Sequence, residues 1–249
     1  MLYFDHSYTN DPGHRFLKQL EKLGFLLDER EVEHEGRQFC RFIMFPSARH
    51  QRGMTYLEFV NVKRGGKPIV KPGLSFGYRS KLERFHQRLV REGKYRSKFE
   101  HRNYDWKMDS SSRLPGWNFL MFKGLGLRGL FPWITEYEPN PNRKPYKPRR
   151  HPNGALSTRG FEFEVNAKGE AFLSYLLGKA LKSVTRLPCG TEFYITRAKR
   201  TKLKAVILNC QSVPRLLRRK GVEQAEFRGQ RAARIRNPSG MWDIVLTDC

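Results

Sequence analysis

The stretch LYFDHSYTNDPGHRFLKQLEKLG, residues 2–24, predicts a short strand followed by an amphipathic helix. Residues 2–8 are the strand, and Asp11-Pro12 is typical of a helix start, since Asp caps free amides and Pro suits the first helical turn. The apolar residues that follow have helical spacing: Phe16, Leu17, Leu20 and Leu23. Gly24 then ends the helix as a left-handed cap. Further strands are expected over 39–45 and 55–62.

The same order of elements recurs in the next segment of the chain. A strand is predicted over residues 74–78, and Ser80-Lys81-Leu82-Glu83 has the pattern of a capping box at a helix start. That helix ends at Gly93, and strands are expected over 117–122 and 131–137. Residues 1–137 are therefore predicted to hold two βαβββ modules that arose by internal duplication.

A connector and a second pair of units complete the predicted organisation. Residues 138–154 contain five prolines and no hydrophobic periodicity, which indicates a semi-rigid connector. Residues 155–249 read as two further, shorter βαβββ-like modules. The expected fold class is α+β, a strand-rich cup with mixed sheets and the helices packed outside.

The composition is strongly basic, with 48 Lys+Arg against 24 Asp+Glu and a net charge of +24. Such a charge attracts anions, whether nucleic acid or small anionic molecules. A nucleic-acid partner is possible but not favoured, because no zinc knuckle, basic zipper or RNA-binding aromatic signature is present. A solvated basic surface is an equally plausible interpretation, and the oligomeric state is left open.

The expected compartment is the cytoplasm. No apolar run approaches a membrane span, which argues against a membrane partner, and the N-terminus lacks a secretory pattern. The cysteines are scattered, as expected of buried or incidental thiols in a reducing compartment: Cys40, Cys189, Cys210 and Cys249.

Three residues on predicted strands are candidate metal ligands. His6 lies on the first strand of module one, Glu58 on its last strand, and Glu136 at the matching place in module two. Imidazole and carboxylate suit Zn, Fe, Mn or Ni, and a lone carboxylate on an apolar strand needs a partner if it is buried. The alternative is that each side chain lies on a solvated face. The other histidines are expected at the surface: His14, His34, His50, His86 and His101.

The order of several short motifs resembles the vicinal oxygen chelate (glyoxalase/bleomycin resistance/dioxygenase) superfamily. In module one these motifs are Phe4-Asp5-His6, Leu23-Gly24-Phe25 and Tyr56-Leu57-Glu58-Phe59. Later segments are similar to its glyoxalase-like domain subgroup: Arg113-Leu114-Pro115-Gly116, Phe131-Pro132-Trp133-Ile134-Thr135-Glu136 and His151-Pro152-Asn153-Gly154-Ala155. The resemblance covers residues 2–165 and rests on the order and spacing of these motifs.

The resemblance implies paired modules that form U-shaped sheets around a divalent metal. By position, His6 and Glu58 match the ligands of module one, and Glu136 matches the carboxylate of module two. Gly73 stands where the family usually has its second histidine. His151 is a candidate for the missing imidazole, and an exposed turn is an equally good interpretation of its segment.

Three functions follow from these observations. The first is a metal-dependent lyase, isomerase or dioxygenase that acts on a small, oxygen-rich substrate, either neutral or anionic, with Glu136 as the candidate general base. The second is a metal-free protein of the same fold that binds a small molecule, which the loss of the histidine at Gly73 favours. The third is a polyanion or nucleic-acid binder that uses the basic connector and the C-terminal half.

Overall fold

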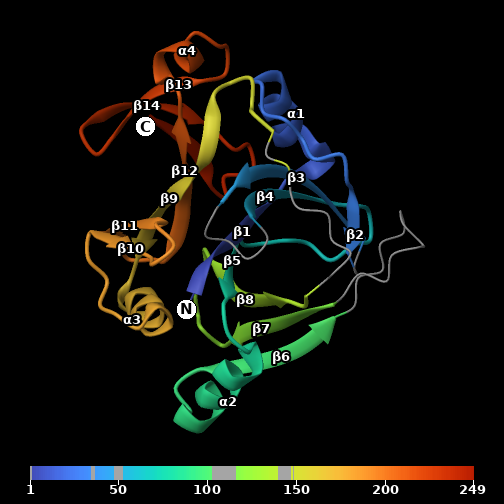
Figure 1. Cartoon of the computed structure of the whole chain (residues 1–249), viewed down its shortest axis with the longest axis vertical. Coiled ribbons are helices and arrows are strands. Elements are labelled where there is room, and N and C mark those ends of the chain that lie inside the picture. Colours follow the sequence, from blue (N-terminus) through green and yellow to red (C-terminus); the bar gives the residue numbers. More distant parts are fainter. Residues whose placement is uncertain (1, 35–36, 48–52, 103–115, 140–146, 148) are drawn as a thin grey trace.

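The computed structural model describes residues 2–34, 37–47, 53–102, 116–139, 147 and 149–249 (Figure 1). His50, the segment Arg113-Leu114-Pro115 and most of the central part of the connector lie outside these residues. The described chain forms two mixed sheets, one of eight strands and one of seven. This arrangement confirms the predicted α+β class with cup-like mixed sheets.

The first sheet contains two modules that meet at their first strands. Module one consists of β1 (Leu2–Asn10), η1 (Pro12–His14), α1 (Arg15–Lys22), β2 (Val32–His34), β3 (Gln38–Pro46) and β4 (Met54–Val62). Module two consists of β5 (Gly73–Tyr78), α2 (Leu82–Glu92), β6 (Arg96–Arg102), β7 (Trp117–Lys123) and β8 (Phe131–Tyr137). The strand order is β2-β3-β4-β1-β5-β8-β7-β6, so each module contributes one half of the sheet.

The pairing of strands is the same in both modules. In each, the first strand pairs in parallel with the last, β1 with β4 and β5 with β8. The two first strands, β1 and β5, pair antiparallel and join the modules. This pattern brings the N-terminal strand to the middle of the sheet, which is why side chains of β1 are central to any site on its face.

The second sheet repeats this plan with one strand fewer. Its elements are β9 (Ala155–Val165), α3 (Ala167–Leu177), β10 (Val184–Arg186), β11 (Glu192–Arg197), β12 (Lys202–Cys210), α4 (Val213–Leu217), β13 (Glu223–Phe227), β14 (Gln230–Ile235) and β15 (Asp243–Asp248). The order is β10-β11-β9-β12-β15-β14-β13, with β9–β11 and β12–β15 parallel. The unit that begins at β9 has two strands after its helix, not the three that were expected.

One hydrophobic core joins the two sheets and the helices. Phe4 of the first sheet packs edge-on against Phe161 of the second, with ring centroids 4.5 Å apart. Phe16 of α1 belongs to the same core and contacts Trp242. The helices therefore pack against the sheet faces that meet this core, and a separate cluster of buried side chains on β2, β3 and β4 lies on the opposite face of the first sheet.

The helix starts differ in part from the predictions. The Asp11 carboxylate accepts hydrogen bonds from the amides of Phe16 and Leu17 at 2.8 and 2.9 Å, so it does bind the first turn of α1. The N-cap residue of α1 is His14, however, because a 3-10 turn over Pro12–His14 lies between Asp11 and the helix. Helix α2 has no capping box, since Lys81 precedes it and no side chain of its own segment caps it. Among the described residues no helix has the length and apolar character needed to cross a membrane.

Candidate metal centre

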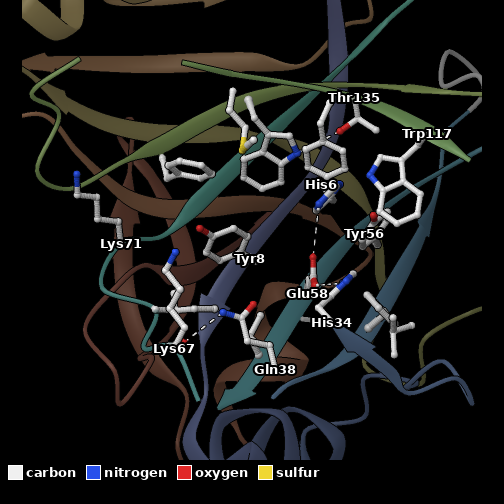
Figure 2. Close-up of a pocket in the computed structure, with 18 of the residues that line it drawn as sticks. His6, Tyr8, His34, Gln38, Tyr56, Glu58, Lys67, Lys71, Trp117 and Thr135 are labelled. Atoms are coloured by element: carbon white, nitrogen blue, oxygen red, sulfur yellow. Dashed lines mark hydrogen bonds and ion pairs between the residues drawn. The ribbon is translucent and has the colours of Figure 1, made fainter. Parts of the chain in front are cut away.

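A cavity of about 690 Å³ opens on the face of the first sheet that turns away from the shared core. We call this space the cup. Its walls are largely aromatic, with rings from both modules: Tyr8, Tyr56, Trp117, Phe119, Trp133 and Tyr137. Figure 2 shows His6 and Glu58 in the same space, with Lys67 and Lys71 to one side.

His6 is fixed in the cup by three neighbours. Its Nδ1 lies 2.6 Å from a carboxylate oxygen of Asp5, and its Nε2 lies 3.4 Å from Oε2 of Glu58. The imidazole stacks on the ring of Tyr56 with centroids 4.3 Å apart. The pairing of β1 with β5 shifts register between Phe4 and His6, and such a bulge lets consecutive residues turn to the same side. Asp5 and His6 therefore act as a pair.

Glu58 is buried on β4 between two imidazoles. Its Oε2 lies near His6, and its Oε1 lies 3.7 Å from Nε2 of His34 on β2. Burial raises the pKa of the Glu58 carboxyl, but the polar interaction with the nearby His34 imidazole and the charge of His6 outweigh it, so the net shift of this pKa is downward. Glu58 is thus held as a carboxylate inside an otherwise apolar strand.

The thiol of Cys40 lies beside this group. The donor atoms of His34, Cys40 and Glu58 all lie within 4.8 Å of one another. Cys40 has no exposed surface, and burial together with the Glu58 charge raises the pKa of its thiol well above the usual value. Three adjacent strands, β2, β3 and β4, therefore bring an imidazole, a thiol and a carboxylate together.

Glu136 does not join the group. It lies on β8, where neighbouring side chains alternate between the two faces of the sheet. Thr135 and Tyr137 line the cup. The Glu136 carboxylate accepts hydrogen bonds from the Leu82 amide at 3.2 Å and from Asn118 at 3.0 Å. Glu136 therefore caps the start of α2 on the other face, in place of the expected capping box.

His151 also lies elsewhere, and it is neither a cup residue nor an exposed turn. It is buried between Phe25 and Phe45 in the shared core. Its Nδ1 accepts a hydrogen bond from the Leu26 amide at 2.9 Å, and its Nε2 lies 3.1 Å from the carbonyl oxygen of Met44. Both ring nitrogens are engaged by main-chain groups, so His151 joins the connector to module one.

Aromatic rings fill the space beside Gly73, the position at which the resemblance predicts a second histidine. A Cβ atom on Gly73 would lie 2.1 Å from the ring of Tyr8 and 2.5 Å from that of Trp133. Two residues further along β5, the Ser75 hydroxyl is bonded to Asp5 and to Thr135, at 3.2 and 3.0 Å. At these two positions β5 therefore has a glycine and a serine hydroxyl and no imidazole that could bind a metal.

No family model and no curated protein matches the sequence. Solved structures do match over nearly the whole chain. A hypothetical protein from Staphylococcus aureus has a TM-score of 0.59 at 13% identity, with 100% of both chains covered. Homoprotocatechuate 2,3-dioxygenase from Arthrobacter globiformis has a TM-score of 0.58 at 11% identity, covering 99% of this chain and 78% of its own. The Mn(II)-bound glyoxalase from Novosphingobium aromaticivorans has a TM-score of 0.58 at 10% identity, with 98% and 81% covered.

Two of these neighbours are a dioxygenase and a glyoxalase, and both have the vicinal oxygen chelate fold. The chain has the vicinal oxygen chelate fold. At identities of 13% and below, the likeness to these structures establishes the fold alone.

In this vicinal oxygen chelate fold, the donor cluster differs from the one that the sequence predicted. His6 and Glu58 come together, and the partners that the sequence did not identify are Asp5, His34 and Cys40. His34 was expected at the surface, but it lies on a three-residue strand and faces Glu58. A strand so short has no periodicity to recognise. The cluster is built within module one.

Proposed function

We propose that this protein is a metal-dependent lyase, isomerase or dioxygenase that acts on a small molecule bound in the cup. The observation that carries the proposal is the convergence of two imidazoles on the buried Glu58 carboxylate beside a cavity of about 690 Å³. His6 and His34 are the proposed nitrogen partners. The glyoxalase and dioxygenase structures with the same fold support this class of activity.

The donor set fits a divalent ion. Bonds of about 2.1 Å to nitrogen or oxygen place neighbouring donors of a tetrahedral site about 3.4 Å apart. Glu58 Oε2 lies 3.4 Å from His6 Nε2, and Glu58 Oε1 lies 3.7 Å from His34 Nε2, so the two imidazoles approach different oxygens of the carboxylate. The imidazoles and the carboxylate are donors that Zn, Fe, Mn and Ni all accept. When bound, such an ion would polarise an oxygen of the substrate.

The residues around the donors hold and orient the substrate. Asp5 and Tyr56 fix the His6 ring, so its Nε2 remains directed at Glu58. The aromatic walls suit a planar molecule, because flat rings pack well against them. Lys67 and Lys71 line the same cavity, and their charge favours an anionic group on the substrate.

Metal analysis of the purified protein tests the proposal. We expect one divalent ion per chain after loading with Zn, Fe, Mn or Ni, and its loss in Glu58→Ala and reduced occupancy in His6→Ala. Glu136→Ala is the matched control, since this carboxylate lies on the other face of the same sheet and should leave the metal content unchanged. A wild-type protein that binds no divalent ion under any loading condition would falsify the proposal.

A metal-free binding protein is the second candidate, and the closure of Gly73 favours it. The rings of Tyr8 and Trp133 occupy the space that a second-module ligand would need. Thermal unfolding with planar, anionic ligands in the presence of a chelator separates the two functions. Stabilisation that is unchanged by chelation supports the metal-free binder, whereas stabilisation that requires the ion supports the enzyme.

A further inference from the structure

We infer that the Cys40 thiol is a metal ligand, so that His34, Cys40 and Glu58 form a site that prefers thiophilic ions such as Zn²⁺ and Co²⁺ over Mn²⁺. This inference rests on the proposed function, because it concerns the ion bound at the same carboxylate. It adds a donor that the family resemblance does not supply, and it places the whole ligand set in module one.

Strand geometry directs the Cys40 side chain toward Glu58. Along β3, Gln38 and Phe42 line the cavity, and Cys40 stands between them with the same alternation. In the pairing of β3 with β4, Phe42 lies opposite Glu58 and Cys40 opposite Val60. Cys40 is thus a diagonal neighbour of Glu58 on the same face, and a neighbour across this distance is within side-chain reach.

The mutual distances of the three donors support one shared ion. Their ligand atoms lie within 4.8 Å of one another, and the Glu58 Oε1 to His34 Nε2 distance of 3.7 Å is close to the donor spacing of a tetrahedral site. Cys40 is completely buried, whereas the His34 side chain is 35% exposed. The site therefore has a closed inner side and an open outer side, from which an ion and a further ligand can enter.

The other three cysteines have different surroundings. The thiol of Cys189 donates to the Thr191 hydroxyl, and those of Cys210 and Cys249 donate to main-chain carbonyls. Each of these contacts is to a neutral oxygen. Cys40 alone among the four, all of which are described, lies with an imidazole and a carboxylate. This distinction supplies internal controls for any thiol-dependent measurement.

The donor chemistry sets the choice of ion. A thiolate sulfur is a soft ligand that favours Zn²⁺ and related ions, whereas carboxylate and water ligands suit Mn²⁺. As the sulfur–metal bond forms, the thiol proton leaves to the buffer, so one proton is released for each ion bound through Cys40. His6 contacts the other carboxylate oxygen and lines the cavity. It is therefore the nitrogen partner of Glu58 on the side of the cavity, and Cys40 adds a donor on the side of His34.

Cobalt substitution of the full-length protein tests the inference. We expect Co²⁺ bound to the wild type to give the near-ultraviolet absorption band of sulfur-to-cobalt charge transfer. Cys40→Ser should abolish this band, and Cys189→Ser should retain it. We also expect Cys40→Ser to weaken Zn²⁺ binding by at least about 10-fold, the lower end of the effect of losing even an indirect partner of a metal. Binding of Mn²⁺ should change less.

The outcomes separate this inference from the proposed function. Bound Co²⁺ with visible d–d absorption but no sulfur band overturns the role of Cys40 and leaves a metal-dependent function standing. Failure to bind any of Co²⁺, Zn²⁺, Fe²⁺, Mn²⁺ and Ni²⁺ overturns both. If Cys40→Ser does not fold, X-ray absorption of the zinc-loaded wild type decides, since a zinc–sulfur distance of about 2.3 Å is expected. A shell of nitrogen and oxygen alone contradicts the inference.

Discussion

Glu58 and Glu136 occupy matching places in the sequences of the two modules, yet they face opposite sides of the sheet. Glu58 lies in the cup between His6 and His34, and Glu136 binds the first amide of α2. A shift of one residue along a strand moves every side chain to the other face. The segments around Glu58 and Glu136 are therefore similar in sequence, but the two glutamates point to opposite faces of the sheet.

The two halves of the cup consequently have different chemistry. Module one contributes the imidazoles, the thiol and the carboxylate, whereas module two contributes rings and hydroxyl groups such as those of Trp133 and Thr135. We interpret module one as the half that binds a metal and module two as the half that shapes the substrate space. Substitutions that change the free energy of unfolding test whether this division is real.

Gly73→Ala should give the largest effect, because it tests whether module two has room for any side chain at the position of the missing ligand. The added methyl group would meet the rings of Tyr8 and Trp133, and we expect a loss of about 3 kcal/mol in the free energy of unfolding, as for overpacked cores. Gly73 does not have a positive φ, so backbone strain does not contribute. Urea denaturation followed by circular dichroism measures the change.

A double-mutant cycle with Tyr8→Ala is the control for this prediction. Removal of the closest ring should make Gly73→Ala less costly than in the wild type, since the two changes share one contact. If Gly73→Ala alone were within about 0.5 kcal/mol of the wild type, a range usual for neutral surface changes, module two could hold a side chain here. The division between the halves would then fail.

His151→Ala tests whether His151, which the sequence predicted as a metal ligand, instead stabilises the shared core. We expect a loss of about 2 kcal/mol, because the Leu26 amide and the Met44 carbonyl lose a buried partner. Metal binding should not change. A loss of the metal with little loss of stability would instead return His151 to the site.

The pH dependence of stability gives a second measurement at His151. Burial, aided by the charge of Arg149 and opposed by the hydrogen bond to Met44, lowers the pKa of His151 below its usual 6.5. The unfolded chain then binds the proton more readily than the folded chain. The contribution of neutral His151 to the free energy of unfolding is therefore fully present above pH 6.5 and is lost as the pH falls toward the folded-state pKa. His151→Gln should remove this part of the pH dependence, and an unchanged pH profile would contradict the assignment.

Most helices and strands could be predicted, because α1, α2 and α3 carry apolar residues at helical spacing and are followed by Gly24, Gly93 and Gly178. The strands β2, β6, β10 and β13 were not predicted, and the C-cap of α4 is Arg218, not a glycine. The sheet face on which each side chain of a strand lies could not be predicted. Strand β8 reads Phe-Pro-Trp-Ile-Thr-Glu-Tyr, and β3 is apolar on both sides. Strands buried on both faces show no alternation. The faces of Glu136 and Cys40 were therefore not determined by the local sequence, and both depended on pairing between distant strands.

Glu136→Ala should give the smallest effect and completes the comparison with Glu58. Loss of a helix cap costs about 1 kcal/mol, and the Leu82 amide is the donor that would lose its partner. Ser80→Ala is the matched control, because Ser80 belongs to the capping box that the sequence predicted and no side chain of that segment caps α2. We expect Ser80→Ala to leave the free energy of unfolding unchanged. The reverse result, a costly Ser80→Ala and a neutral Glu136→Ala, would show that Glu136 does not cap α2. Glu136 would then again be a candidate metal ligand, as Glu58 is.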